Sequence, residues 1–292
     1  MMLVSGFTVL RNAQLMDYPA VESIRSALPL VDEYVVAIGQ CDDQTRADIE
    51  AIGDPKIKII DTHWDCSRST GGLILSEKTN EALSFCKGTW CLYLQADEVL
   101  HECDYERLRA CMAQHRDNEA VQGILFKYIH FYGSFDTIAT SRKWYRSEIR
   151  IVRNNETIQS VGDAKGFRSS GKKLDVVDSG ATVYHYGWVK PPKQMGQKCK
   201  HFLRWWYGNA RDGDFDSFEF SRIYGLKKFA GSHPSAIAER VKNQGWVFDR
   251  RRRWADVQMS DARLVLSDCL EKIVGTLPFE KKPYRRVISS FS

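Results

Sequence analysis

Two adjacent carboxylates follow a short, strongly apolar segment, and their types and spacing suit them to chemistry. Residues 90–94 are apolar and rich in aromatic and branched side chains, and directly after them come Gln95, Ala96, Asp97 and Glu98. A segment of about five residues with this composition predicts a buried strand. In open α/β sheets, ligands bind at the carboxyl ends of the strands. Asp97 or Glu98 could therefore hold a hard divalent cation, and the cation a phosphate group. The alternative is that one of them caps the next helix.

Polar residues follow three earlier predicted strands in the same way. Residues 3–10 are followed by Arg11 and Asn12, residues 34–38 by Asp42 and Asp43, and residues 57–60, after a short interval, by Asp65. Asn80, in the helix predicted before residues 90–94, could face the same crevice. Acidic groups that converge on one edge of a sheet repel one another unless a cation or a basic ligand lies among them. The sequence therefore predicts a ligand site at this edge.

The elements that position these residues alternate between strand and helix over the first 100 residues. Helices are expected from Pro19, near Ile49 and Ile52, before Gly88, and at about 102–115. This alternation predicts a mostly parallel sheet with right-handed crossovers.

The alternation of strand and helix then ends, because strands are expected at 121–132, 147–153 and 181–186 without long helices between them. Gly162, Gly166 and Gly171 indicate a loop-rich region. These strands suit a mixed, partly antiparallel continuation of the sheet. From about residue 193 the chain is aromatic and helical, with a further helix at 259–274. The predicted fold class is therefore α/β, with a Rossmann-like, mostly parallel sheet, a mixed C-terminal half, and then a helical subdomain. The domains are expected at 1–190 and 191–292.

Composition limits the class of protein. The chain has 292 residues, of which 43% are hydrophobic and 27% charged, so wholesale disorder is excluded. No apolar run approaches about 18 residues, and no basic stretch precedes the apolar N-terminus, so neither a membrane-spanning helix nor a signal peptide is expected. None of the eight cysteines forms a C-x-x-C pair, which favours reduced thiols in a cytoplasmic protein.

The order and spacing of short motifs in the first half of the chain resemble those of glycosyltransferase family 2, whose members have the GT-A fold. The segments that carry the resemblance are residues 7–12, 39–45, 79–83 and 92–99. The resemblance covers residues 3–190 and implies a GT-A domain that binds a nucleotide-sugar.

The resemblance implies a metal and diphosphate site after residues 90–94. In this family a D-x-D motif at that point binds a divalent metal and the sugar-nucleotide diphosphate. Asp97 matches the second aspartate, Gln95 stands where the first is expected, and Ala96 lies between them. The amide of Gln95 keeps an oxygen acceptor but loses the charge. The implied cofactor is Mn²⁺ or Mg²⁺.

The resemblance also implies contacts to the nucleotide and a late histidine. The loop after the first strand and an aspartate after the second meet the base in this family, and Asn80 is a further candidate for donor binding. The corresponding positions are Leu10, Arg11, Asn12 and Asp43, with Gly39 where the more usual aspartate would stand. His185 is the candidate for completing the metal site or contacting the diphosphate. Its alternative is a half-buried strand histidine bonded to the backbone.

An inverting transferase needs a general base to take the proton of the acceptor hydroxyl, and the base is usually a carboxylate in this family. Asp163 is favoured because it lies in a glycine-flanked loop, where catalytic side chains are often displayed. Glu148 is the alternative, although in an alternating strand it could pair with an arginine. Arg168, with Arg150 and Arg153, could neutralise a leaving diphosphate.

The expected function is therefore transfer of a sugar from a nucleotide-diphosphate donor, with UDP favoured, to a hydroxyl of a glycan, a lipid-linked or a protein acceptor. The reaction is expected to be inverting and metal-dependent, as in a hexosyltransferase. Gln95 motivates the alternative, a non-catalytic relative of the same fold that binds a sugar nucleotide or glycan.

The basic, aromatic tail suggests further partners. Residues 196–255 contain tryptophans among basic groups, and Lys198, Lys200 and Arg204 fall near one helical face. This region is expected to pack on the sheet, or to bind the acceptor or touch a membrane surface. A cytoplasmic location, with peripheral contact to the inner face of the cell membrane, is predicted. No nucleic-acid partner is expected, because the net charge of +5 is modest and no nucleic-acid module is present.

Overall fold

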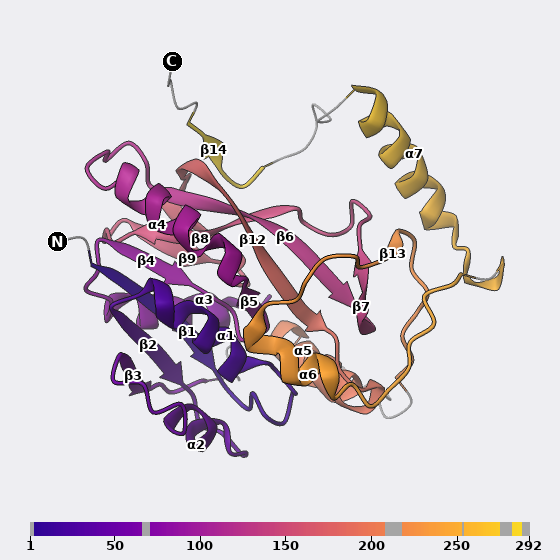
Figure 1. Ribbon diagram of the computed structural model, residues 1–292, viewed down its shortest axis with the longest axis horizontal. Coiled ribbons are helices and arrows are strands. Elements are labelled where there is room, and N and C mark those ends of the chain that lie inside the picture. The colour runs from indigo at the N-terminus through magenta and orange to yellow at the C-terminus, as the bar shows by residue number, and fades with distance from the viewer. Residues whose placement is uncertain (1–2, 66–70, 208–217, 253, 275–281, 288–292) are drawn as a thin grey trace.

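The first four long strands form a parallel sheet, as the sequence predicts. The computed structural model describes residues 3–65, 71–207, 218–252, 254–274 and 282–287 (Figure 1). β1 (Val4–Leu10), β2 (Glu33–Ile38), β3 (Ile57–Asp61) and β4 (Trp90–Tyr93) lie in the order β3-β2-β1-β4. All three pairings are parallel. β2 and β4 are buried throughout, which explains why their sequences are apolar apart from Glu33 at the start of β2.

Helices cover both faces of this parallel half. α1 (Ala20–Ala27), with the 3₁₀ turn η1 (Leu28–Leu30), and α4 (Tyr105–Gln114), preceded by η3 (Glu102–Asp104), bury Ile24, Leu108 and Met112 against one face. α3 (Leu73–Ser84) buries Ala82 and Leu83 against the other. α2 (Thr45–Glu50) connects β2 to β3. The crossover helices bring the carboxyl ends of β1, β2 and β4 to one edge of the sheet.

The second half of the sheet is mixed, as the sequence predicts. β8 (Ser147–Arg153) pairs antiparallel with both β4 and β6 (Gly123–Tyr132), and β7 (Ser134–Ala139) pairs antiparallel with β6. The long β12 (Asp175–Trp188) runs parallel to β6 and antiparallel to the short β5 (Glu98–Leu100). The predicted fold class, α/β with a parallel first half and a mixed continuation, is confirmed.

The region expected to be loop-rich contains a small separate sheet, so that prediction was wrong. β9 (Ile158–Val161), β10 (Gly166–Ser169) and β11 (Lys172–Lys173) pair antiparallel in sequence. Gly162 and Gly171 lie in the two turns, with φ of 61° and 76°. The glycines therefore mark tight turns between short strands.

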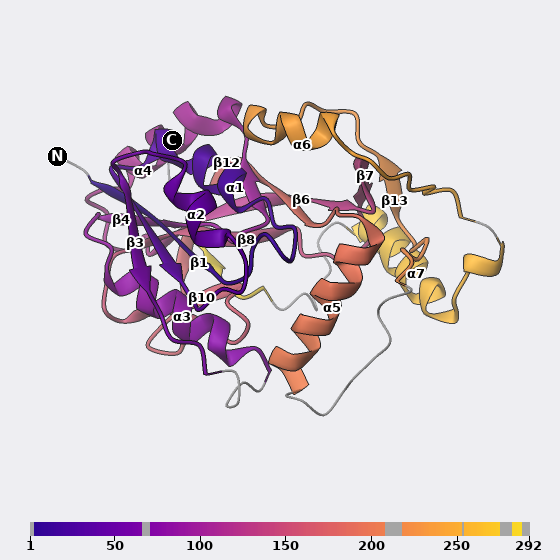
Figure 2. The ribbon, with the colours of Figure 1, turned by 90° about the horizontal axis from the view of Figure 1, so that it is seen from below.

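The chain after β12 is mainly helical, but it also returns to the sheet. Its helices are α5 (Pro192–Tyr207), η5 (Ser235–Ile237), α6 (Ala238–Lys242), η6 (Trp254–Asp256) and α7 (Met259–Val274). β13 (Leu226–Lys228) extends the sheet beside β7, and β14 (Arg285–Arg286) pairs with β12. Figure 2 shows α5 on the same side of the sheet as α3, opposite α1, α4 and α6. The division at residues 190 and 191 stays a prediction.

In the described part of the chain, no helix is long and apolar enough to cross a lipid bilayer. The seven cysteines that the structure describes are free thiols. Cys66 lies outside the described residues.

Candidate functional site

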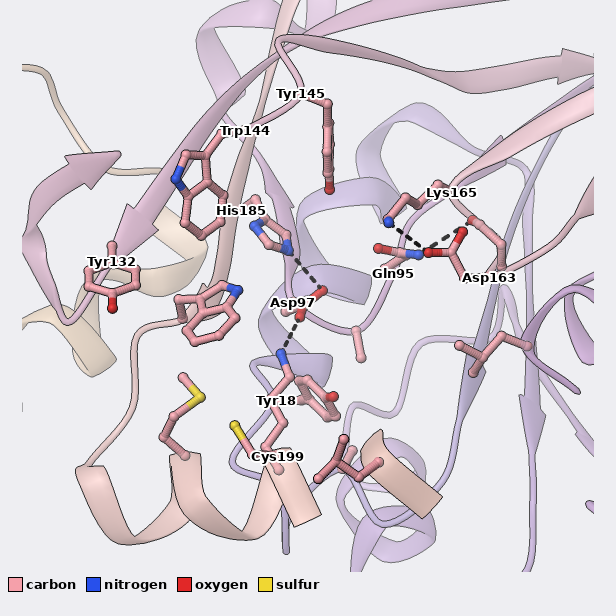
Figure 3. A pocket seen from close by; sticks show the side chains of 18 of the residues that line it. Tyr18, Gln95, Asp97, Tyr132, Trp144, Tyr145, Asp163, Lys165, His185 and Cys199 are labelled. Carbon is pink, nitrogen blue, oxygen red and sulfur yellow. Dashed lines mark hydrogen bonds and ion pairs between the residues drawn. The ribbon is translucent and has the colours of Figure 1, made fainter. Parts of the chain in front are cut away.

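A cavity of about 910 Å³ opens at the carboxyl edge of the parallel strands (Figure 3). Seven of the residues proposed from the sequence line it: Leu10, Arg11, Gln95, Ala96, Asp97, Asp163 and His185. They come from the ends of β1, β4 and β12 and from the turn between β9 and β10. The fold thus brings together residues up to 175 positions apart in the chain.

The side chains of Asp97 and Glu98 point in different directions after the end of β4. Asp97 lines the cavity, whereas Glu98 begins β5 and points into the protein, where its side chain is fully buried. Both oxygens of Glu98 accept hydrogen bonds from Arg150, each at 2.7 Å. The expectation that either carboxylate could hold a cation therefore narrows to Asp97. The helix-capping alternative was wrong, because a strand follows these residues and His101 caps the next turn.

Asp97 faces a lysine and a histidine from the second half of the chain. Lys198 on α5 donates a hydrogen bond to Asp97 Oδ2 at 3.2 Å, and His185 Nε2 lies 3.7 Å from Asp97 Oδ1 (Figure 3). The main chain is fixed as well, since the Tyr186 N–H donates to the Asp97 carbonyl at 2.8 Å. Burial opposes ionisation of Asp97, but Lys198 and the other basic groups nearby together outweigh it and hold the pKa of Asp97 well below its usual range. Asp97 is therefore a carboxylate at neutral pH.

A chain of hydrogen bonds fixes the tautomer of His185. His130 Nε2 lies 2.7 Å from the Tyr145 carbonyl, which can only accept, so this nitrogen carries a proton. Burial lowers the pKa of His130 to about 3, so its Nδ1 has no proton and accepts from His185 Nδ1 at 3.0 Å. Burial also lowers the pKa of His185 to about 4, against the opposing charge of Asp97. The neutral His185 ring therefore presents an unprotonated Nε2 to Asp97.

Gly187 leaves open the space between these two groups. A Cβ at Gly187 would lie 2.5 Å from Asp97 Oδ2 and 2.8 Å from His185 Nε2. A carboxylate oxygen and a ring-nitrogen lone pair that face each other repel unless a cation or a donor joins them. Their chemistry fits a divalent cation such as Mn²⁺. Within the described ranges no third His, Cys, Asp or Glu joins them, so a bound anion or water would have to supply further ligands.

A second buried lysine lies near the same carboxylate. Lys190 is fully buried and donates hydrogen bonds to the carbonyls of Met16 and Asp17, both at 3.0 Å. Burial and the neighbouring charge of Lys198 together lower its pKa to about 7, against the opposing effect of Asp97. Both ammonium groups lie over the ring of Tyr18, at 4.6 Å for Lys190 and 4.8 Å for Lys198. Lys190 thereby holds the loop after β1 against the end of β12.

The opposite wall of the cavity carries the favoured base. Asp163 lies in the turn between β9 and β10, and its carboxylate pairs with Lys165 at 2.7 Å. The next residue, Ala164, has a left-handed backbone with φ of 59°, and its carbonyl accepts from Gln95 Nε2 at 3.4 Å (Figure 3). Gln95 therefore connects the end of β4 to the turn that displays Asp163.

Aromatic rings form the far end of the cavity. Tyr132 and Trp188 stack at 5.7 Å between centroids, and Trp144 meets Trp188 edge-on at 6.1 Å. Such surfaces bind the apolar faces of rings.

Three proposed nucleotide contacts hold local structure and are not among the residues that line the cavity. Asn12 exchanges hydrogen bonds with Asp42, its side-chain oxygen accepting from the Asp42 N–H at 2.8 Å. Asp43 accepts from the Leu15 and Thr45 main chains at 2.7 and 3.0 Å, so it closes the turn before α2. Asn80 on α3 exchanges two hydrogen bonds with the main chain of Ser160.

Two further candidates lie on β8 and β10. Glu148 is buried, its Oε2 has no hydrogen-bond partner among the described residues, and burial raises its pKa to about 7, although Arg150 opposes this. Arg168 donates to the carbonyl of Pro283 near the C-terminal segment. Neither is among the residues that line the cavity. Their predicted roles as base and diphosphate contact stay untested.

Lys198 and Lys190 were missed as site residues, as was the aromatic wall. The sequence placed Lys198 and Lys200 near one helical face, yet Lys198 lines the cavity and Lys200 is exposed. The side chain of Arg204 lies outside the described residues. No periodic pattern in the sequence distinguishes these two lysines from the others. They reach the site only because the chain continues from β12 into α5 beside the cavity.

The fold and the site together define an α/β protein with a charged cavity at the carboxyl edge of its parallel strands. The parallel order β3-β2-β1-β4 continues into antiparallel β8 and β6, and charged groups gather at the carboxyl edge. No protein-family model matches the sequence, and no curated protein matches it.

Several solved structures resemble the chain at low sequence identity. TarS of S. aureus is 14% identical, with 69% of this chain and 39% of that chain covered and a TM-score of 0.39. TarS 1–349 in complex with UDP is 16% identical, with 67% and 63% covered and a TM-score of 0.40. Glucosyl-3-phosphoglycerate synthase from Mycobacterium tuberculosis, in complex with Mn²⁺, UDP and phosphoglyceric acid, is 17% identical, with 44% and 43% covered and a TM-score of 0.32.

The chain spans less than two thirds of the length of each of these structures. At TM-scores below 0.5 these likenesses carry no argument.

Proposed function

We propose that this protein is a glycosyltransferase, which moves a sugar from a nucleoside-diphosphate donor to an acceptor hydroxyl. The observation that carries the proposal is the group of Asp97, His185 and Lys198 at the carboxyl edge of the sheet, inside a cavity of about 910 Å³. A carboxylate, an unprotonated imidazole and an ammonium in one place suit a diphosphate and its cation. Cavities that bind small molecules are usually about 300–1,000 Å³, so this one has room for a nucleotide-sugar.

The donor would lie with its nucleotide near Leu10 and Arg11 and its diphosphate near Asp97. UDP is the expected nucleotide of the donor. Asp97 and His185 are the residues that would hold a divalent cation, Mn²⁺ or Mg²⁺. When bound, the cation would stabilise the charge that develops on the leaving diphosphate.

Asp163 is the proposed general base. Its carboxylate would take the proton from the acceptor hydroxyl while the hydroxyl oxygen bonds to the anomeric carbon. The bond from that carbon to the diphosphate oxygen breaks in the same step, and the leaving group keeps the electron pair. A single displacement of this kind inverts the anomeric centre. The ion pair with Lys165 holds the Asp163 carboxylate in place.

The acceptor is a glycan, a lipid-linked sugar or a protein, and the aromatic end of the cavity is the proposed place for it. Tyr132, Trp144 and Trp188 offer ring faces there. A cytoplasmic location with peripheral membrane contact stays a prediction.

The test is thermal unfolding with UDP, GDP, CDP and TDP, each with and without Mn²⁺, followed by assay of the matching nucleotide-sugars against an array of glycan acceptors. A ligand at about 100 times its Kd should add roughly 2.7 kcal/mol to the free energy of unfolding. We expect one nucleotide to stabilise the protein, and Asp97→Asn to remove the Mn²⁺-dependent part. The control is Asp61→Asn, since Asp61 ends β3 at the same edge but its side chain is 85% exposed.

Absence of a shift with every nucleotide would overturn the proposal. Nucleotide binding without turnover of any donor, even by hydrolysis, would favour the alternative, a non-catalytic relative that binds a sugar nucleotide. Gln95 supports that alternative, because it replaces a charged residue and donates its amide to Ala164.

A further inference from the structure

Lys198 occupies one side of the only carboxylate that faces His185 among the described residues. Its Nζ lies 3.2 Å from Asp97 Oδ2 and 2.8 Å from the carbonyl of Gly187, and it lies 4.8 Å from the ring centre of Tyr18. The ammonium thus contacts the end of β4, the end of β12 and the loop after β1. Its side chain is 13% exposed and lines the cavity.

A buried carboxylate needs a counter-ion. Asp97 is 7% exposed and pairs with Lys198 at 3.2 Å, so without Lys198 its charge would lose its nearest compensation. In the ligand-free protein the ammonium supplies this compensation. The same ammonium opposes a divalent cation between Asp97 and His185, because like charges that share one carboxylate repel each other.

A diphosphate would change this balance. It brings more negative charge than one divalent cation neutralises, and its oxygens accept hydrogen bonds from an ammonium. The lysine stem has four carbons and is flexible, so a change of rotamer can move the ammonium from one acceptor to another without movement of α5.

We propose that Lys198 is an exchangeable counter-ion: it pairs with Asp97 in the free protein and with the donor's diphosphate in the complex. This inference rests on the proposed function, and it adds α5 to the donor site. Binding of cation and diphosphate is then coupled. Lys198 disfavours the cation alone, favours the diphosphate alone, and leaves Asp97 to the cation once the diphosphate is bound, so each ligand strengthens the other.

The test measures two affinities in Lys198→Met, which removes the charge and nearly keeps the shape. Calorimetry with UDP and with pyrophosphate in EDTA should show binding weakened by roughly 10- to 100-fold, as expected for loss of a charged hydrogen bond. Titration of the variant with Mn²⁺ alone, monitored by electron paramagnetic resonance, should show that it binds Mn²⁺ at least about 5-fold more tightly than the wild type does. A factor of this size is typical of the coupling between two binding sites.

Two controls accompany the variant. Lys200→Met lies two residues further along the same helix at an exposed position and should change neither affinity. Lys198→Arg keeps the charge and should stay close to the wild type in both. Thermal unfolding confirms that each variant is folded.

Opposite changes in the two affinities are the signature of an exchangeable counter-ion. If Lys198→Met leaves both unchanged, or weakens both, the inference is overturned while nucleotide binding by the wild type still supports a transferase. If the wild type binds neither UDP nor pyrophosphate, with or without Mn²⁺, the proposed function and this inference both fail.

Discussion

Glu98 and Arg150 form a bidentate ion pair at the centre of the sheet, and neither side chain is exposed to solvent. Two further groups donate hydrogen bonds to the Glu98 carboxylate. The Tyr128 hydroxyl donates to Glu98 Oε1 at 2.7 Å and the Gln95 N–H to Oε2 at 3.0 Å. Because Gln95 and Glu98 flank Asp97 in the chain, this network fixes the main chain that presents Asp97 to the cavity.

Breaking that pair should destabilise the whole protein. Arg150→Met leaves a buried carboxylate without its cation, and we expect the free energy of unfolding to fall by about 3–5 kcal/mol. Urea unfolding monitored by circular dichroism measures this. The comparison is Arg146→Met, since Arg146 pairs with Glu271 at a side chain that is 54% exposed, and a change of at most about 1 kcal/mol is expected. Equal losses in the two variants would contradict the assignment.

The parallel half of the fold could be predicted because its sequence is locally consistent. β4 and residues 34–38 of β2 are continuous apolar segments, and polar residues follow each parallel strand. The cavity edge follows from topology, since parallel strands carry their ends to one side. The small sheet of β9 to β11 escaped prediction because its strands have only two to four residues, and the turn glycines dominate the pattern.

Roles within the site were less predictable. A sequence does not distinguish a polar side chain that faces a cavity from one that closes a turn. Asn12 and Asp43 therefore looked like Arg11, although their hydrogen bonds to Asp42 and Thr45 hold local structure. Lys198 lies 101 positions after Asp97, and only the path of α5 brings the two together.

Glu148 should make stability depend on pH. Burial raises the pKa of this carboxyl from 4.5 to about 7, against the charge of Arg150, so the folded state binds the proton more tightly than the unfolded state. The free energy of unfolding should therefore fall as pH rises from about 4.5 to about 7. Glu148→Gln mimics the protonated form, so it should remove this fall and stabilise the protein above pH 7 by roughly 1–3 kcal/mol.

Urea unfolding at pH 5 and pH 8 measures both effects of Glu148→Gln, the loss of the pH dependence and the gain in stability. Glu50→Gln, at an exposed site, is the control. An unchanged pH dependence in Glu148→Gln would refute the explanation.

Gly187 should be intolerant of even one methyl group. A Cβ there would meet Asp97 Oδ2 at 2.5 Å and His185 Nε2 at 2.8 Å, so Gly187→Ala must push these groups apart. We expect a stability loss of about 1–3 kcal/mol and loss of Mn²⁺-dependent nucleotide binding. Calorimetry with UDP and Mn²⁺ tests the second effect. Gly245→Ala is a matched control, because no atom lies within 4 Å of a Cβ built there. Retention of full Mn²⁺-dependent binding in Gly187→Ala would show that the space is not used.

The two candidates for the general base, Asp163 and Glu148, can be distinguished by the transfer activity of their variants. Asp163 lines the cavity beside Lys165, whereas Glu148 is buried and does not line it. Asp163→Asn should therefore reduce sugar transfer by roughly 10²- to 10⁴-fold while nucleotide affinity stays within about 2-fold, because the base acts on the acceptor and not on the donor. Glu148→Gln should keep transfer within a few-fold of the wild type. Release of the nucleoside diphosphate from the matching donor, measured at saturating acceptor, reports transfer in both variants.

The reverse result, with transfer lost in Glu148→Gln and kept in Asp163→Asn, would assign the role of general base to Glu148. The acceptor would then have to reach a buried side chain on β8 that does not line the cavity.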